Sequence, residues 1–207
     1  LYSSAASDVY KRQEPLCGGG HDLAILSWAA RVLDRWDPGD PLRFCPHCTC
    51  EMTEQEAFGR VRPVCPTCGY IHFAAPKVGV SVLAERDGQA LLIQRAIEPG
   101  LGKWSLPSGF VEWDEAPEVA AAREVVEETG LEVADLKLLS VDHYTEDYRG
   151  AGLNINYRAS VSGGELNAAD DAAGVRFFHV GELPALEEIA FESHRRVLAE
   201  WARGREG

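Results

Sequence analysis

Three glutamates in the middle of the chain have the spacing of a metal-binding helix face. Glu124 is followed by Glu127 and Glu128, and residues three or four positions apart lie on the same side of an α-helix. Carboxylates gathered in this way repel one another and raise each other's pKa unless positive charge lies among them. Arg123 alone cannot balance three of them. Hard oxygen donors in this arrangement suit Mg²⁺ or Mn²⁺, and Mg²⁺ in turn suits phosphate substrates.

The segment from Ala116 to Thr129 predicts the helix that this arrangement requires. It is rich in Ala, Glu and Val, and it contains no glycine. Pro117 falls in the first turn, where its missing N–H does no harm. Asp114 is placed to cap the start of the helix, and Gly130 fits the left-handed residue that commonly ends one. We therefore expect the three glutamates on one face of a short helix.

A solvated acidic helix surface is the plain alternative, because most glutamate-rich helix faces have no other role. That alternative does not account for Gly109 and Glu115 ahead of the helix, or for an Arg-Glu pair directly before the Glu-Glu pair. The motif reads Gly, five residues, Glu, seven residues, Arg-Glu, an apolar residue, any residue, Glu-Glu, any residue, Gly and an apolar residue. In this form the segment from Gly109 to Leu131 resembles the Nudix hydrolases, which cleave a nucleoside diphosphate linked to another group.

The resemblance implies both a reaction and a set of metal ligands. The reaction is attack of water on a phosphorus atom of a pyrophosphate, which yields two phosphorylated products. Metal ions assist such a step by activating the water and by neutralising the developing charge. The ligands implied for Mg²⁺ or Mn²⁺ are the backbone carbonyl of Ser108 and the carboxylates of Glu124, Glu127 and Glu128.

The remaining residues of the motif are expected to support this set. Glu115 is the supporting carboxylate, and Arg123 is expected to orient the acidic groups rather than to contact substrate. Gly109 lacks a Cβ atom, so its backbone is able to approach the metal closely.

The general base is not specified by the motif. Many Nudix proteins use a carboxylate from a later loop, and Asp171 lies near one such position, ahead of the last predicted helix. Asp142, Glu146 and Asp147 lie at a strand end or in a loop and remain alternatives. Ordinary surface charge also explains each of these four carboxylates. A general base must lie within reach of the proton that it removes, and position in the sequence does not show this.

Two Cys-x-x-Cys pairs form a second chemical centre. Cys45 pairs with Cys48, and Cys65 pairs with Cys68. Four thiolates from two such turns make a tetrahedral Zn²⁺ site, which stabilises a segment too short to bury a core. The site is predicted to be structural, because four sulfur ligands leave no open position for water. Cys50 is left outside the site, and a redox role is disfavoured because no βαβ pattern surrounds the paired knuckles.

Apolar segments separated by turn residues surround the acidic helix. We expect strands at 78–84, 90–95, 136–143, 155–161 and 175–179, with an Asp87-Gly88 hairpin turn and an amphipathic helix at 191–203. These elements fit the Nudix α/β/α sandwich with a mixed sheet that the resemblance implies. The domains expected are a non-native or disordered leader at 1–20, an amphipathic helix and linker at 21–41, a four-Cys zinc ribbon at 42–75 and a Nudix hydrolase domain at 76–204.

Composition limits the classes of partner. The chain has 207 residues, 45% of them hydrophobic, and a net charge of −13. Such acidity argues against gripping a nucleic-acid backbone, which requires clustered Lys and Arg. No apolar run approaches the roughly eighteen residues of a membrane span. We expect a cytoplasmic protein that binds a small-molecule nucleotide, with a homodimer as an open alternative to a monomer.

The order of a zinc ribbon and a Nudix domain resembles the NADH pyrophosphatases. The stretch from Leu139 to Glu146 lacks the Ser-Gln-Pro-Trp-Pro-Phe-Pro segment of those enzymes, and the stretch from Ile189 to Ser193 is more similar to zinc-ribbon Nudix enzymes assigned to ADP-ribose or FAD. The predicted function is Mg²⁺-dependent hydrolysis of ADP-ribose or of a dinucleotide such as FAD or NADH. The alternative is a nucleotide-sensing or nucleic-acid-binding adaptor with the ribbon as its binding module; the complete acidic set favours the enzyme.

Overall fold

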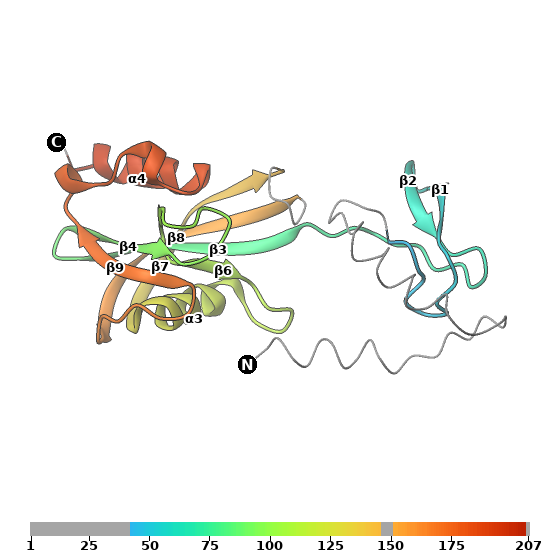
Figure 1. Cartoon of the computed structure of the whole chain (residues 1–207), viewed down its shortest axis with the longest axis horizontal. Coiled ribbons are helices and arrows are strands. Elements are labelled where there is room, and N and C mark those ends of the chain that lie inside the picture. Colours follow the sequence, from blue (N-terminus) through green and yellow to red (C-terminus); the bar gives the residue numbers. More distant parts are fainter. Residues whose placement is uncertain (1–41, 146–150, 206–207) are drawn as a thin grey trace. The chain divides into compact units, whose positions relative to one another are not determined.

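The computed structural model describes residues 42–145 and 151–205, and the chain divides into two compact units between Ala75 and Pro76 (Figure 1). The expected leader at 1–20 and the expected helix and linker at 21–41 lie outside the described residues. The domain boundaries drawn from the sequence stay predictions. Within the described parts, no helix is both long enough and apolar enough to cross a membrane.

The first unit is a small antiparallel hairpin beside two cysteine turns. Strands β1 (Thr53–Ala57) and β2 (Arg60–Val64) pair in register from Thr53 with Val64 to Ala57 with Arg60. Among residues 42–75, the buried apolar residues are Cys45, Met52 and Cys65. Within this described part, a core of three residues is small for a fold held by apolar packing alone.

The second unit is built on a seven-stranded mixed sheet. Its main order is β5-β4-β3-β8-β7, with β6 paired to β3 and β9 paired to β4. Strands β3 and β8 are parallel, and the other pairs are antiparallel. The strands are β3 (Lys77–Arg86), β4 (Gln89–Arg95), β5 (Trp104–Ser105), β6 (Ser108–Phe110), β7 (Leu131–Tyr144), β8 (Gly152–Gly164) and β9 (Ala172–Phe178).

Two helices cover opposite faces of this sheet (Figure 1). Helix α3 (Pro117–Thr129) packs on one face and helix α4 (Glu192–Arg203) on the other. Alternation along β3 supplies both cores, because successive side chains point to opposite faces of a sheet: Val80 and Val82 pack with the α3 cluster, and Leu83 packs with the α4 cluster. Two 3₁₀ turns precede α4, at Val180–Glu182 and Leu186–Glu188. The predicted α/β/α sandwich is confirmed.

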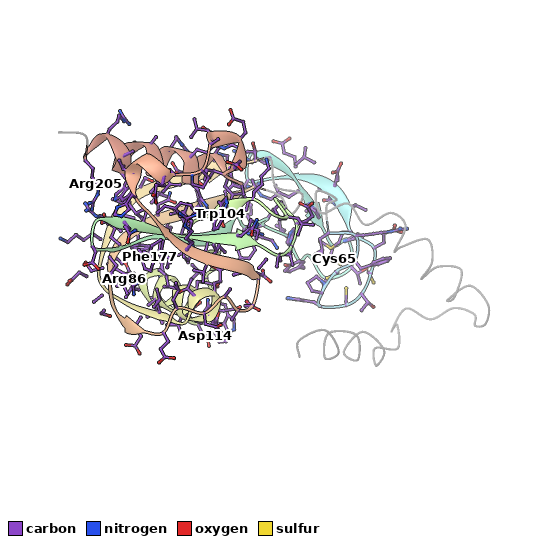
Figure 2. All side chains as sticks on the ribbon, turned by 60° about the vertical axis from the view of Figure 1, so that its left-hand side comes forward. Cys65, Arg86, Trp104, Asp114, Phe177 and Arg205 are labelled. Carbon is purple, nitrogen blue, oxygen red and sulfur yellow. The ribbon has the colours of Figure 1, made fainter. Side chains whose placement is uncertain are left out.

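The termini of the predicted elements are partly as expected. Gly130 ends α3 in the left-handed conformation, with φ of 70°, as predicted. The cap predicted at the start is wrong: Ala116 occupies the N-cap without a side-chain hydrogen bond, and Asp114 is exposed ahead of it (Figure 2). Pro117 lies at the start of the helix, where one of the N–H groups that a cap would satisfy is absent.

The strands after α3 are longer than predicted. Strand β7 begins at Leu131, directly after the helix-ending glycine, and β8 continues to Gly164. Their pairing contains register shifts between Glu132 and Ser140, so the alternation of buried and exposed side chains breaks down there, because a bulge places two residues opposite one. Period-two patterning therefore identifies the middle of these strands and misses their ends.

Candidate active site

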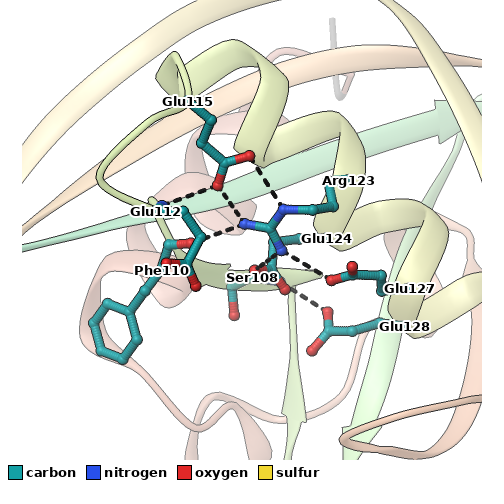
Figure 3. Close-up of polar contacts among 8 residues, drawn as sticks. All are labelled: Ser108, Phe110, Glu112, Glu115, Arg123, Glu124, Glu127 and Glu128. Atoms are coloured by element: carbon teal, nitrogen blue, oxygen red, sulfur yellow. Dashed lines mark hydrogen bonds and ion pairs between the residues drawn. The ribbon is translucent and has the colours of Figure 1, made fainter. Parts of the chain in front are cut away.

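Arg123 lies at the centre of the acidic residues of the motif (Figure 3). It donates hydrogen bonds to the carboxylates of Glu115, Glu124 and Glu127; the bonds to Glu124 and Glu127 are 2.7 and 2.9 Å long. It also donates to the backbone carbonyl of Phe110 at 3.0 Å. The guanidinium thus ties the middle of α3 to the segment that leads into it. The hydrogen bonds from Arg123 lower the pKa of Glu115, and the hydrogen bond from the N–H of Glu112 lowers it further.

Glu128 is held by a different partner. Its side chain is only 2% exposed, and its Oε2 accepts a hydrogen bond of 2.9 Å from the backbone N–H of Ser108. Burial raises the pKa of Glu128 to about 8, and the carboxylates of Glu124 and Asp171 add to the rise. Burial also raises the pKa of Glu124, against the opposing effect of Arg123. Two neighbouring carboxylates are therefore held in an environment that disfavours their negative charge.

Gly109 lies against the carboxylate of Glu124. A Cβ atom built at Gly109 would lie 2.1 Å from Cδ of Glu124 and about as close to both of its oxygens. From the sequence, we expected glycine at this position because it lets the backbone approach a metal ion closely. The structure supplies a more direct reason, which is that the side chain of Glu124 occupies the space that any other residue would fill.

The chemistry of these donors fits a hard divalent cation. Glu124 and Glu128 offer oxygen atoms, and a cation between them would offset the cost of burying both charges. Among residues 42–145 and 151–205, only the four cysteines bring ligand atoms from three or more side chains within 4.8 Å of one another.

The loop ahead of β9 lies at the end of α3, beside Glu128. The N–H of Asn167 donates to the carbonyl of Thr129, and the N–H of Ala169 donates to that of Glu128. Asp171 follows in this loop, and burial, followed by the charge of Asp170, raises its pKa. Among the candidate bases, Asp171 is therefore on the same side of the molecule as the acidic cluster.

The other candidate bases are placed differently. Asp142 accepts a hydrogen bond of 2.8 Å from Asn156 and forms an ion pair with Arg196 on α4 at 3.0 Å. It belongs to the face of the sheet opposite α3 and does not join the acidic cluster. Glu146 and Asp147 lie outside the described residues.

Two residues lie near the site although the sequence pattern did not predict them there. Arg95, at the end of β4, is 6% exposed, and its charge acts on both Glu128 and Asp171. His194 on α4 contacts the segment that precedes the motif. Neither residue belongs to a local spacing pattern, so only the pairing of distant strands and helices places them here.

The four predicted cysteines form a second cluster, in the first unit, where Figure 2 labels Cys65. Backbone N–H groups point at the sulfur atoms: that of His47 at Cys45, 3.4 Å away, and that of Cys68 at Cys65, 3.5 Å away. The N–H of Cys68, together with that of Thr67, lowers the pKa of Cys65 to about 6, which favours the thiolate. Cys50 is not part of the cluster.

The two cysteine turns have the same backbone form although their sequences differ. Gly69, after the second pair, has φ of 76°, and Thr49, at the equivalent place in the first pair, has φ of 60°. Each donates its N–H to the carbonyl of the first cysteine of its turn, Cys65 or Cys45. Thr49 therefore adopts a left-handed conformation that glycine adopts more easily.

Comparison with known proteins identifies relatives of this chain. The family model described as NUDIX domain matches residues 75–201. An ADP-ribose pyrophosphatase from Methanocaldococcus jannaschii is 40% identical over 139 residues, which are 67% of this chain and 78% of that protein. The NAD-capped RNA hydrolase NudC from Stutzerimonas stutzeri is 31% identical over 159 residues; these are 76% of this chain but only 55% of that protein.

Solved structures give the same picture of the fold. A NUDIX hydrolase from Nitrosomonas europaea superposes with a TM-score of 0.70 at 30% identity, covering 80% of this chain and 93% of that one.

Proposed function

This chain belongs to the NUDIX family, and we propose that it hydrolyses the pyrophosphate bond of a nucleoside diphosphate linked to another group. The observation that carries the proposal is the pair of largely buried carboxylates, Glu124 and Glu128, beside the backbone of Ser108. Buried carboxylates at close quarters are costly unless a cation joins them. A divalent cation is also what neutralises the charge of a reacting pyrophosphate.

The residues proposed to hold Mg²⁺ or Mn²⁺ are Glu124, Glu127 and Glu128, with the backbone carbonyl of Ser108. When bound, the ion supplies the positive charge that makes a water molecule more acidic and offsets the charge of the phosphate. The N–H of Ser108 already fixes one oxygen of Glu128, so that carboxylate is oriented before any ion arrives. Such orientation of metal ligands by a second set of groups is what tunes metal affinity.

Glu115, Arg123 and Asp171 complete the proposed catalytic set. Arg123 and Glu115 act as a positioning pair, because together they connect the backbone around Phe110 and Glu112 to α3. Asp171 is proposed as the general base. Its neighbourhood to Glu128 and its raised pKa support this role, because a base works best when its pKa is near the working pH.

ADP-ribose is the first substrate that we propose. The relative named ADP-ribose pyrophosphatase is 40% identical, and this chain spans most of its length. NADH and related dinucleotides come second, because the NudC relative is named for NAD-capped RNA but is matched over only 55% of its length. FAD belongs in the same group of candidates.

The cysteine cluster is proposed to hold a structural Zn²⁺, since four thiolates at this spacing match its preferred tetrahedral geometry. An adaptor that binds nucleic acid through the ribbon is the second candidate. The ribbon offers Arg43, Arg60 and Arg62 but also Glu51, Glu54 and Glu56, which leaves little positive charge for gripping phosphates. A cytoplasmic location and a homodimer stay predictions.

A panel of substrates tests the proposal. The full chain is assayed with Mg²⁺ against ADP-ribose, FAD, NADH, diadenosine tetraphosphate and nucleoside triphosphates, beside Glu128→Gln and a matched variant, Glu182→Gln, at an exposed surface glutamate. We expect turnover by wild type and Glu182→Gln and a loss of about 100-fold or more in Glu128→Gln, at the upper end of the range for residues around a metal. Absence of turnover on every substrate, or equal turnover by Glu128→Gln, would contradict it.

A further inference from the structure

One side chain of α4 reaches the segment that carries the acidic site from the opposite face of the sheet. His194 is 2% exposed, and both of its ring nitrogens are hydrogen-bonded. Nδ1 lies 3.2 Å from the backbone nitrogen of Leu106, and Nε2 lies 2.9 Å from Oγ of Ser81. Helix α4 lies on the other face of the sheet from α3 (Figure 1), so this contact links two separate layers.

These two hydrogen bonds define the protonation of the ring. A backbone N–H is only a donor, so Nδ1 of His194 must be the bare, accepting nitrogen when it binds Leu106. The proton is then on Nε2, which donates to Ser81. Burial, together with the charge of Arg95, lowers the pKa of His194 to about 3. The neutral ring is thus matched to both of its partners.

Both partners of His194 lie next to Ser108. Leu106 precedes it by two residues, with only Pro107 between them, and a proline restricts the backbone of itself and of the residue before it. Ser81 is the residue of β3 that pairs with Ser108 of β6. Holding Leu106 and Ser81 from one ring therefore limits the position of Ser108, whose N–H donates to Glu128.

We propose that His194 is a positioning residue for the metal site: it holds Leu106 and Ser81 so that the backbone of Ser108 faces Glu128. The inference rests on the proposed function, in which Glu128 and the Ser108 carbonyl bind the catalytic ion. Packing alone does not require this residue, because a leucine would fill the buried space beside Leu106 and Phe191 without needing polar partners of its own.

Three substitutions of His194 separate positioning from packing. His194→Leu removes both hydrogen bonds. His194→Asn keeps an acceptor near the place of Nδ1, whereas His194→Gln places its amide nearer to Nε2 and leaves the Leu106 N–H without an acceptor. Val197→Ala is the matched control, because Val197 is buried on the same helix and belongs to the apolar cluster. All variants are compared in the full chain with its zinc retained.

The first readout needs no turnover. Binding of Mn²⁺ alone is followed by electron paramagnetic resonance, and exchange of the Ser108 amide proton is followed by nuclear magnetic resonance. We expect His194→Leu and His194→Gln to weaken Mn²⁺ binding about tenfold, a typical effect of removing a residue that orients metal ligands, and to speed exchange at Ser108. His194→Asn should lie close to wild type, and Val197→Ala should change neither quantity.

The second readout is kinetic. The half-saturating Mg²⁺ concentration should rise by about the same factor in His194→Leu and His194→Gln, with KM for the nucleotide unchanged. Wild-type Mn²⁺ binding and Ser108 exchange in His194→Gln overturn the proposal, and so does an equal loss in Val197→Ala. If the wild-type chain turns over no substrate while the Mn²⁺ pattern holds, the proposed function fails and the positioning role of His194 stands. If His194→Leu does not fold, the Asn and Gln pair decides.

Discussion

Arg123 binds the carboxylate of Glu115 through two nitrogens. Nη2 lies 2.5 Å from Oε1, and Nε lies 3.2 Å from Oε2. The same guanidinium reaches Glu124, Glu127 and the carbonyl of Phe110. A planar group with donors in a rigid fork is suited to bridging several carboxylates at once, which a point charge on a flexible stem is not.

Arg123→Lys should therefore lower kcat/KM strongly although it conserves charge. A lysine cannot bind Glu115 in this paired way and still reach Glu124, so the acidic groups lose their common support. We expect a fall of about 10–100-fold in kcat/KM with Mg²⁺. Arg176→Lys is the control, because Arg176 pairs with Glu182 at an exposed site. Equal activity of the two variants would show that the network around Arg123 is dispensable.

Gly109→Ala tests the contact between this glycine and Glu124. The new methyl group would lie 2.1 Å from Cδ of Glu124, so the carboxylate must move. We expect a loss of about 1–3 kcal/mol in the free energy of unfolding, as for other crowded sites, together with weaker Mn²⁺ binding. Gly181→Ala is the matched control, since a Cβ there meets no atom within 4 Å. Unchanged Mn²⁺ affinity in Gly109→Ala would refute the steric explanation.

The stability of the protein without Mg²⁺ or Mn²⁺ should fall as the pH rises from about 6.5 to about 8. Burial raises the pKa of Glu128 from 4.5 to about 8, so in this window the folded state holds a proton that the unfolded state has lost. Glu128 then contributes a slope of at most about 1.4 kcal/mol per pH unit. Below about 6.5 the buried His194, whose pKa is lowered to about 3 in the folded state, contributes a slope of the opposite sign.

Hydrogen exchange of β3 and β4 during urea unfolding, with zinc retained, measures this stability. Glu128→Gln should flatten the pH dependence, and added Mg²⁺ should reverse it, because a bound cation favours the carboxylate. A wild-type stability that rises between pH 6.5 and pH 8 without Mg²⁺ would rule out the raised pKa of Glu128 as the dominant effect.

Loss of zinc should unfold the first unit and leave the second intact. Cys65→Ser removes one of the four proposed zinc ligands, and residues 42–75 bury only a small apolar core. We expect the zinc content, measured by atomic absorption, to fall from about one per chain to near zero. Amide protection should be lost in β1 and β2 and kept in β3. Cys50→Ser should keep its zinc; if it does not, the ligand set is wrong.

Asp171→Asn and Asp142→Asn compare the two candidate bases that the structure describes. Asp171 lies in the loop beside Glu128, whereas Asp142 pairs with Arg196 on the other face of the sheet. We expect kcat to drop by about 10²–10⁴-fold in Asp171→Asn, with loss of one limb of its pH profile, and to change little in Asp142→Asn. The reverse result would move the base to the α4 face.

The sequence by itself determined the parts of the site whose geometry is local. Glu124, Glu127 and Glu128 share a face because the α-helix has a fixed period, and Gly130 ends that helix because a left-handed residue is needed there. The two Cys-x-x-Cys turns could also be predicted, because each is formed by a few consecutive residues. In each case the geometry depends on a few neighbouring residues, so it can be predicted from their spacing along the chain.

Only the tertiary structure decided which distant residues lie near the acidic cluster. Asp171 and Asp142 look alike in the sequence, and the pairing of β7 with β8 and the loop ahead of β9 place them on different sides. The contact of Gly109 with Glu124, and that of His194 with Leu106, also depend on strand register and on which helix covers which face. Such contacts arise from packing between segments far apart in the chain, so they cannot be predicted from local backbone geometry.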